Sequence, residues 1–143
     1  VEHTVTEILT RVDIVKWQIR IAAGLNLGFT QEDISLKGSA IECRINAAAP
    51  GTVDYMHIPG GPFVRFDTYL DAGSSISAYF DSLLGKLVVY ATQREEAIRK
   101  MKSALCELVI QGVPNNTMEQ AQLIGAEAFM RGTYDLDFWS EQR

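Results

Sequence analysis

The chain has 143 residues, 47% of them hydrophobic, and a formal net charge of -5. This length suits one domain of ordinary size, with enough apolar residues for a core. The acidic balance and the absence of a Lys/Arg block argue against nucleic-acid binding, and no apolar run approaches the roughly 20 residues that span a bilayer. We therefore expect a soluble chain with neither nucleic acid nor membrane as a partner.

The chain opens, without a methionine, on the polar segment VEHTVTE (residues 1–7). Such a dense group of carboxylates, hydroxyls and an imidazole, with no signal-peptide pattern, suggests a fragment of a longer protein that begins inside an active site. His3 and Glu7 could share a metal ion if the segment were helical, but His57 is the only other histidine, so we predict no metal site. We expect His3 and Glu7 to orient the loop that carries Glu2.

The next segment predicts a helix over 13–24. Asp13 is a suitable N-cap, Gly24 ends the pattern, and the apolar residues between them form one broad face that we expect to pack. From residue 39 to about residue 90, short β-branched and aromatic runs alternate with Gly and Pro clusters, which indicates a sheet. We expect strands at 40–47, 63–69 and 84–91.

The first of these strands alternates in polarity, so its two faces should differ. Its apolar residues, predicted to face the core, are Ile41, Cys43, Ile45 and Ala47; its polar residues, predicted to carry the chemistry, are Glu42, Arg44 and Asn46. Cys43 and Cys106 lie too far apart in sequence for a redox pair or a zinc knuckle. We expect both to be buried thiols in a reducing cytoplasm.

The last third of the chain predicts helices. A long amphipathic helix is expected to begin at a capping box of Thr92 with Glu95 and to end at Gly112, and a shorter one begins at a box of Thr117 with Gln120. The apolar residues of the tail, expected to seal an edge of the core, are Tyr134, Leu136, Phe138 and Trp139. The sequence thus predicts an α+β fold, a mainly antiparallel sheet with covering helices.

Several blocks, in order along nearly the whole chain, resemble the biotin carboxylase family. The opening is similar to the family's VEHPVTE hallmark, with Thr4 in place of its proline. Further likeness lies in DIVKWQIRIAAG (13–24), IECRINA (41–47), PGGP (59–62) and DSLLGKL (81–87). The resemblance implies that residues 1–30 end an ATP-grasp domain, with an active-site strand and helix, and that residues 31–143 are the biotin carboxylase C-terminal domain.

The resemblance also implies roles for individual residues. Glu2 matches the general base that deprotonates bicarbonate for attack on the terminal phosphate of ATP, and the Val1 backbone N–H would bind a bicarbonate oxygen. Arg44 matches the arginine that faces bicarbonate and biotin and stabilises enolate-like charge. Asp81 would lie near Arg44 and orient it. The alternatives are an Arg44 that pairs with Glu42 or Asp81, and an Asp81 that only forms a turn.

Three more residues, Pro62, Phe63 and Arg65, fall on a stretch that lies at the subunit interface of bacterial biotin carboxylases, so the resemblance implies dimer contacts there. An ordinary exposed strand arginine is the alternative for Arg65. The segment 47–58 is shorter than its counterpart in the family. We expect this shortening to change the edge of the sheet and the geometry of the site where biotin would bind.

The resemblance finally implies a cytoplasmic ATP-dependent ligase that carboxylates biotin on a biotin carboxyl carrier protein. It would form a homodimer, work with carboxyltransferase subunits and serve acetyl-CoA carboxylase in fatty-acid synthesis; pyruvate or propionyl-CoA carboxylase, or a non-catalytic dimerisation module, are the alternatives. ATP and magnesium would bind the full-length protein. The chain itself has no recognisable glycine-rich lid, phosphate lysines or magnesium carboxylates, so we expect the fragment alone to bind no cofactor and to be inactive.

Overall fold

The computed structural model describes residues 3–135 and 137–141 of the chain. It begins with two helices, α1 (His3–Thr10) and α2 (Ile14–Ala22), followed by a 3-10 turn (Gln31–Asp33) and an extended connection to the first strand. The later helices are α3 (Arg94–Glu107), α4 (Thr117–Gly125), α5 (Glu127–Arg131) and α6 (Phe138–Glu141). Across the described ranges, no helix has the length and apolar character that crossing a membrane requires.

A three-stranded antiparallel sheet lies at the centre of the fold, in the order β1-β6-β4. Its strands are β1 (Ser39–Asn46), β6 (Leu83–Ala91) and β4 (Val64–Thr68), which confirms the three predicted strands with small shifts of their ends. Two short antiparallel pairs accompany it, β2 (Gly51–Thr52) with β5 (Ser75–Ile76) and β3 (Tyr55–His57) with β7 (Val109–Gln111). The predicted α+β class is confirmed.

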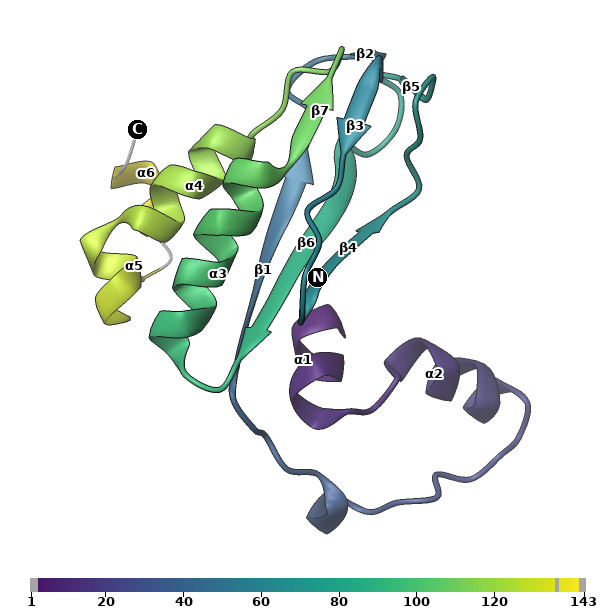
Figure 1. The fold of residues 1–143 in the computed structure, drawn as a ribbon. Coiled ribbons are helices and arrows are strands. Elements are labelled where there is room, and N and C mark those ends of the chain that lie inside the picture. The colour runs from purple at the N-terminus through teal and green to yellow at the C-terminus, as the bar shows by residue number, and fades with distance from the viewer. Residues whose placement is uncertain (1–2, 136, 142–143) are drawn as a thin grey trace.

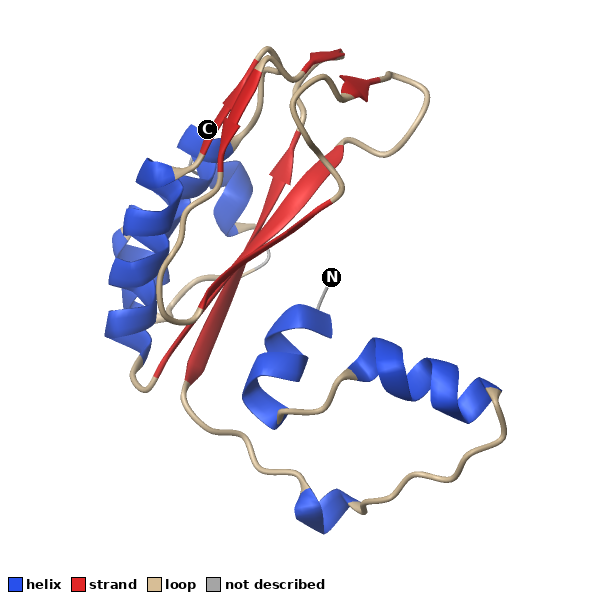
Figure 2. Ribbon diagram, turned by 45° about the vertical axis from the view of Figure 1, so that its right-hand side comes forward, coloured by secondary structure: helices blue, strands red, loops and turns tan. Residues whose placement is uncertain are grey.

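The two faces of the central sheet are covered by different helices. α3 and α4 pack on one face, whereas α1 lies against the other, as Figures 1 and 2 show from two directions. Because side chains alternate along a strand, each strand contributes to both faces. The face toward α3 forms the core, whose main buried members are Ile41, Cys43, Ile45, Leu87, Val89, Ala97, Ile98, Met101, Ala104 and Leu105.

Both predicted capping boxes are wrong, and the long helix is shorter than expected. α3 ends at Glu107, because Val109, which continues the apolar pattern, lies in β7 and pairs with His57 of β3. At the other end, the Thr92 hydroxyl donates to the Glu96 carboxylate at 3.3 Å instead of capping the helix.

α4 begins at Thr117 as predicted, but its first turn is held by Asn115, two residues before it. The Asn115 side-chain oxygen accepts from the Thr117 hydroxyl at 2.6 Å and from its backbone N–H at 3.2 Å. The hydroxyl is therefore engaged outside the expected box with Gln120.

The burial of Cys106 was predicted wrongly. Cys43 is buried as expected, but Cys106 is exposed because it lies on the outer side of α3.

The prediction for α2 is right about its start and wrong about its packing. Its predicted N-cap is confirmed, since the Asp13 carboxylate accepts from the Lys16 backbone N–H at 2.8 Å. Yet α2 has no buried residue, and Ile19 is 67% exposed. The apolar face of α2, expected to pack, is open to solvent.

Candidate functional site

The face of the sheet toward α1 carries charged side chains on all three strands. Residues directly opposite each other in an antiparallel sheet share a face, and the strand register therefore defines two rows across β1, β6 and β4. The first row is Arg44, Lys86 and Asp67, and the second is Glu42, Val88 and Arg65. This set of six residues is the charged face. It brings together Arg44 and Arg65, which the sequence singled out separately.

α1 contacts the charged face through one polar interaction with each strand. Residues 3–10 were expected to form a strand or loop, and their helical form is a correction. The helix presents His3, Thr4 and Glu7 to the sheet. The contacts are a hydrogen bond from Thr4 Oγ1 to Glu42 Oε2 on β1, a 3.0 Å contact between His3 Nδ1 and Lys86 Nζ on β6, and a 3.1 Å ion pair between Glu7 Oε2 and Arg65 on β4.

Glu42 is held in a partly dehydrated position. Burial raises the pKa of its carboxyl group, and nearby positive charge, with Lys86 the largest contributor, opposes that rise. One carboxylate oxygen, Oε2, accepts from the buried Thr4 hydroxyl, whereas Oε1 is buried without a hydrogen-bond partner. Glu42 therefore lies among cations but is bonded to a neutral donor.

Arg65 is fixed by two carboxylates, so it is not an isolated exposed arginine. Its guanidinium donates to both oxygens of Asp67, at 2.6 Å and 2.5 Å, and to Glu7 at 3.1 Å. The hydrogen bonds from Arg65 hold the pKa of Asp67 below its usual range. The hydrogen bonds to Asp67 and to Glu7 raise the pKa of Arg65. Glu7 Oε1 also accepts from the Ile14 backbone N–H at 3.0 Å, which ties the start of α2 to the same group.

Arg44 lies beside Lys86 with no ion pair to either predicted carboxylate. Within the described part of the chain, neither Glu42 nor Asp81 comes within ion-pair distance of its guanidinium. Asp81 is exposed in a turn, where its Oδ1 accepts from the Leu83 backbone N–H at 2.8 Å. The turn alternative for Asp81 thus describes its observed contact, and no ion pair within the described residues engages Arg44.

The backbone around Arg44 is held by Asn116, which sequence reasoning did not single out. The Asn116 side-chain amide donates to the Arg44 carbonyl at 3.2 Å and accepts from the Asn46 backbone N–H at 2.8 Å. The Asn116 backbone N–H donates to the Asn46 carbonyl at 3.2 Å. The loop before α4 therefore fixes the end of β1 that carries Arg44.

The N-terminal residues Val1 and Glu2 lie outside the described residues. His3, the first described residue, begins α1, and its Nε2 lies 3.9 Å from Glu7 Oε2 one helical turn later. Among the described residues there is no group of three His, Cys, Asp or Glu side chains that fits a metal ion. Arg44 and Lys86 instead offer adjacent positive charge, which fits a carboxylate or carbonate ligand.

Of the predicted interface residues, Pro62 and Phe63 lie in the turn before β4, and Arg65 lies in β4 itself. Phe63 is 63% exposed, and its ring lies edge-on to Tyr90 with centroids 5.4 Å apart. Lys100 Nζ lies 5.4 Å from the centre of the same ring and 3.3 Å from the Pro62 carbonyl. These contacts hold the turn in place and leave an aromatic surface in solvent.

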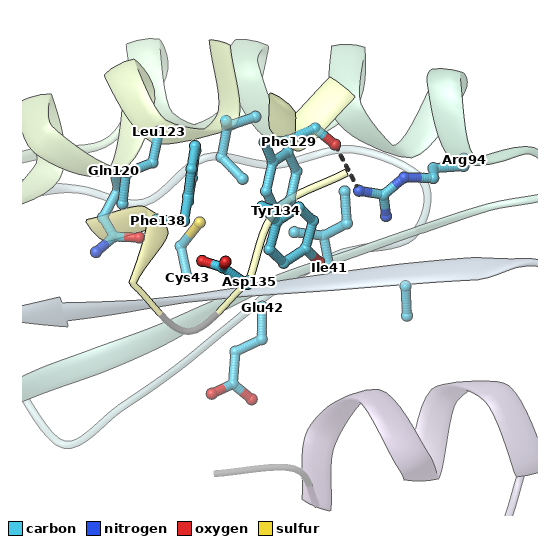
Figure 3. A pocket seen from close by; sticks show the side chains of 12 residues that line it. Ile41, Glu42, Cys43, Arg94, Gln120, Leu123, Phe129, Tyr134, Asp135 and Phe138 are labelled. Carbon is cyan, nitrogen blue, oxygen red and sulfur yellow. Dashed lines mark hydrogen bonds between the residues drawn. The ribbon is translucent and has the colours of Figure 1, made fainter. Parts of the chain in front are cut away.

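A cavity of about 440 Å³ lies on the other side of β1, between that strand and α4, α5 and the C-terminal segment. Figure 3 shows the Glu42 side chain extending from β1 away from this cavity, whereas Cys43 points toward it. The cavity wall is mainly apolar, and Arg94 donates to the Phe129 carbonyl at 2.8 Å. Phe138 is buried there, as predicted for the tail; Leu136 and the side chain of Trp139 are outside the described residues.

Comparisons with known proteins place this geometry in context. Residues 42–141 match the family model of the biotin carboxylase C-terminal domain. The chain is 43% identical to the biotin carboxylase of Haemophilus influenzae, with 96% of this chain and 32% of the relative covered. It is 42% identical to a pyruvate carboxylase subunit of Methanothermobacter thermautotrophicus, with 100% and 31% covered.

Solved structures give the same relationship. The biotin carboxylase domain dimer of Hydrogenobacter thermophilus 2-oxoglutarate carboxylase, solved with MgADP, ADP and bicarbonate, superposes with a TM-score of 0.96 at 41% identity. The match covers 99% of this chain and 33% of that one. The chain thus spans about a third of the length of the relatives that it matches.

Proposed function

The chain belongs to the biotin carboxylase family, and we propose that it forms the C-terminal third of a ligase that carboxylates biotin with ATP and bicarbonate. In this proposal, residues 1–30 complete an ATP-grasp domain and residues 31–143 form the C-terminal domain. The observation that carries it is the docking of α1, the helix that directly follows Glu2, on the charged face that includes Arg44. One site would therefore be assembled from both parts of the chain.

In the proposed chemistry, Glu2 accepts a proton and Arg44 stabilises a negative charge. Glu2 takes the proton of bicarbonate, so that the freed oxygen attacks the terminal phosphate of ATP and ADP leaves. The Val1 N–H would hold a bicarbonate oxygen. The carboxyphosphate formed would then break down to carbon dioxide and phosphate beside biotin. The phosphate would take the proton of the biotin nitrogen, and that nitrogen would attack the carbon dioxide, while Arg44 stabilises the negative charge on the biotin ring oxygen. The absence of a carboxylate on Arg44 in the described chain supports this role.

ATP, magnesium and biotin belong to the proposed full-length protein. The MgADP and bicarbonate bound to the 2-oxoglutarate carboxylase domain support this ligand set. The described residues contain no group that fits magnesium, so the phosphate and metal ligands would come from the part of the relatives that this chain does not match. The biotin would arrive on a carrier protein, and carboxyltransferase subunits would use the product.

We also propose a homodimer in which Pro62, Phe63 and Arg65 make contacts. The dimer named for the 2-oxoglutarate carboxylase relative supports a dimeric state. Of the three residues, Phe63 has the most free surface, whereas Arg65 is engaged by Glu7 and Asp67. Asp81 stays a candidate for the biotin side of the site, with its carboxylate exposed.

The final acceptor that we propose is acetyl-CoA, in the first step of fatty-acid synthesis. Pyruvate is a second candidate, because the pyruvate carboxylase relative from Methanothermobacter thermautotrophicus matches along 100% of the chain at 42% identity. Supplying the carboxylated carrier and the matching carboxyltransferase with either acetyl-CoA or pyruvate separates the two, since only the true acceptor consumes the carboxyl group.

The test is biotin- and bicarbonate-dependent ADP release by the full-length protein. We expect Glu2→Gln and Arg44→Ala each to lower kcat at least about 100-fold, the size of effect seen when a general base or an oxyanion donor is removed. The matched controls are Glu95→Gln and Arg99→Ala, two exposed positions on α3. An inactive wild type, or site variants as active as the controls, would favour the non-catalytic dimerisation module.

A further inference from the structure

We infer that Thr4 and Glu42 are positioning residues, and that their hydrogen bond keeps Glu42 from pairing with Arg44. This inference rests on the proposed function, because Arg44 is the residue whose availability it explains. The hallmark proline that Thr4 replaces has no hydroxyl, so the interaction is a property of this chain and not of the hallmark in general.

Thr4 of α1 is buried. Among the residues that the structure describes, Thr4 is the single polar residue that is buried, with 0% of its surface exposed. Its hydroxyl reaches across from α1 to Glu42 Oε2, 38 residues away in sequence. A buried hydroxyl without a partner is unfavourable, so this bond favours one position of α1 on β1.

The Thr4–Glu42 hydrogen bond differs from the other two contacts that α1 makes with the sheet. The Glu7–Arg65 pair includes an arginine side chain that is 38% exposed, and His3, which contacts Lys86, is 28% exposed. Water can replace part of such contacts, and long cationic side chains can follow a shifted helix. The short Thr4 side chain cannot follow a shifted helix, so it fixes the position of α1 on the sheet more strictly than His3 and Glu7 do.

Without the Thr4 hydroxyl, Glu42 would need another partner. Its second oxygen, Oε1, is already buried without a partner. Among the described residues, Lys86 is the cation that acts most strongly on this carboxylate, but its Nζ already lies 3.0 Å from His3 Nδ1. Arg44 also acts on it, lies two residues away on the same face of β1 and has no ion pair within the described residues. Loss of the Thr4 hydroxyl would leave both oxygens unpaired, and a turn toward Arg44 would satisfy them. The ligand-binding guanidinium would then be occupied by its own strand.

The test uses the full-length protein with Thr4→Val, which removes the hydroxyl at nearly constant size, and Thr4→Ser, which retains it. The matched control is Thr92→Val, because the Thr92 hydroxyl also donates to a glutamate, Glu96, but at the exposed start of α3. We measure kcat and the KM for bicarbonate in biotin-dependent ADP release, and hydrogen exchange of the α1 backbone amides.

We expect Thr4→Val to lower kcat about tenfold or more and to speed α1 exchange about tenfold, since small displacements of catalytic groups have large effects. Thr4→Ser and Thr92→Val should stay within about threefold of wild type. Adding Glu42→Gln to Thr4→Val should restore part of kcat, because a neutral amide competes weakly for Arg44. A general loss of folding would give no such rescue.

Two results overturn the inference. Thr4→Val with wild-type kcat and wild-type exchange would show that the bond positions nothing. A double variant no more active than Thr4→Val would show that Glu42 does not capture Arg44. If the wild type itself releases no ADP, the proposed function fails, and with it the protection of Arg44; the exchange of α1 amides then decides separately whether Thr4 fixes the helix.

Discussion

The two faces of the central sheet hold their helices by different means. Toward α3, the strands contribute fully buried side chains such as Leu87 and Ile45, which share one hydrophobic core with Met101 of α3. Toward α1, the same strands contribute charges, and each strand makes one polar contact. Apolar packing is strong and non-directional, whereas hydrogen bonds are weaker but fix direction. The α3 face therefore provides the stability of the domain, and the α1 face provides the alignment of its site.

The largest effect should come from the apolar face. Leu87 is 0% exposed in the middle of β6, and Leu87→Ala should lower the free energy of unfolding by about 2–5 kcal/mol through lost burial and a cavity. Urea unfolding measures it. Leu36→Ala is the control, because Leu36 is 73% exposed and its truncation should cost little. Equal losses for the two variants would contradict the assignment of the core.

A smaller effect should come from Arg65→Ala on the polar face, about 1 kcal/mol once solvent screening of this partly exposed group is allowed for. Its pH dependence has a definite sign. Because Arg65 lowers the pKa of Asp67 in the folded state, the stabilisation is complete above the unfolded pKa and is lost as the pH falls through the folded one. The difference between wild type and variant should shrink below about pH 4; a constant difference would argue against the pair.

The smallest effect should come from Glu42→Gln, with the opposite sign. Burial raises the pKa of Glu42 in the folded state, so its contribution is complete below the unfolded pKa of about 4.3 and is lost as the pH rises through the folded value. Wild type should therefore lose stability relative to Glu42→Gln as the pH rises above about 4.3 in urea titrations. Glu95→Gln, on the surface of α3, is the control. A gain with rising pH would refute the burial argument.

Much of the sheet could be predicted from local pattern. Alternation along β1 placed Glu42 and Arg44 on one face and Cys43 on the other, as observed. The opposition of Arg44 and Lys86 could not be predicted, because it depends on the register of two strands about 40 residues apart. The contact between Thr4 and Glu42 could not be predicted either, because it depends on how α1 docks on β1. A single sequence contains no signal for either contact.

The predictions of helices failed where tertiary contacts override the intrinsic helix propensity of the residues. The β-branched residues Thr4, Val5 and Thr6 disfavour a helix, yet α1 forms because docking on the charged face uses its side chains. At the end of α3, Val109 continues the apolar pattern, but a short apolar run fits a strand equally well. Val109 lies in a strand because it pairs with His57 of β3.

The Asn116 amide has a consequence beyond the position of Arg44. β1 is an edge strand, and edges with free N–H and C=O groups invite other chains to add to a sheet, which leads to aggregation. The Asn116 side chain pairs with the Arg44 carbonyl and the Asn46 N–H as an additional strand would. One asparagine thus occupies the Arg44 carbonyl, the Asn46 N–H and the Asn46 carbonyl, so a foreign strand cannot pair with these groups at the Arg44 end of β1.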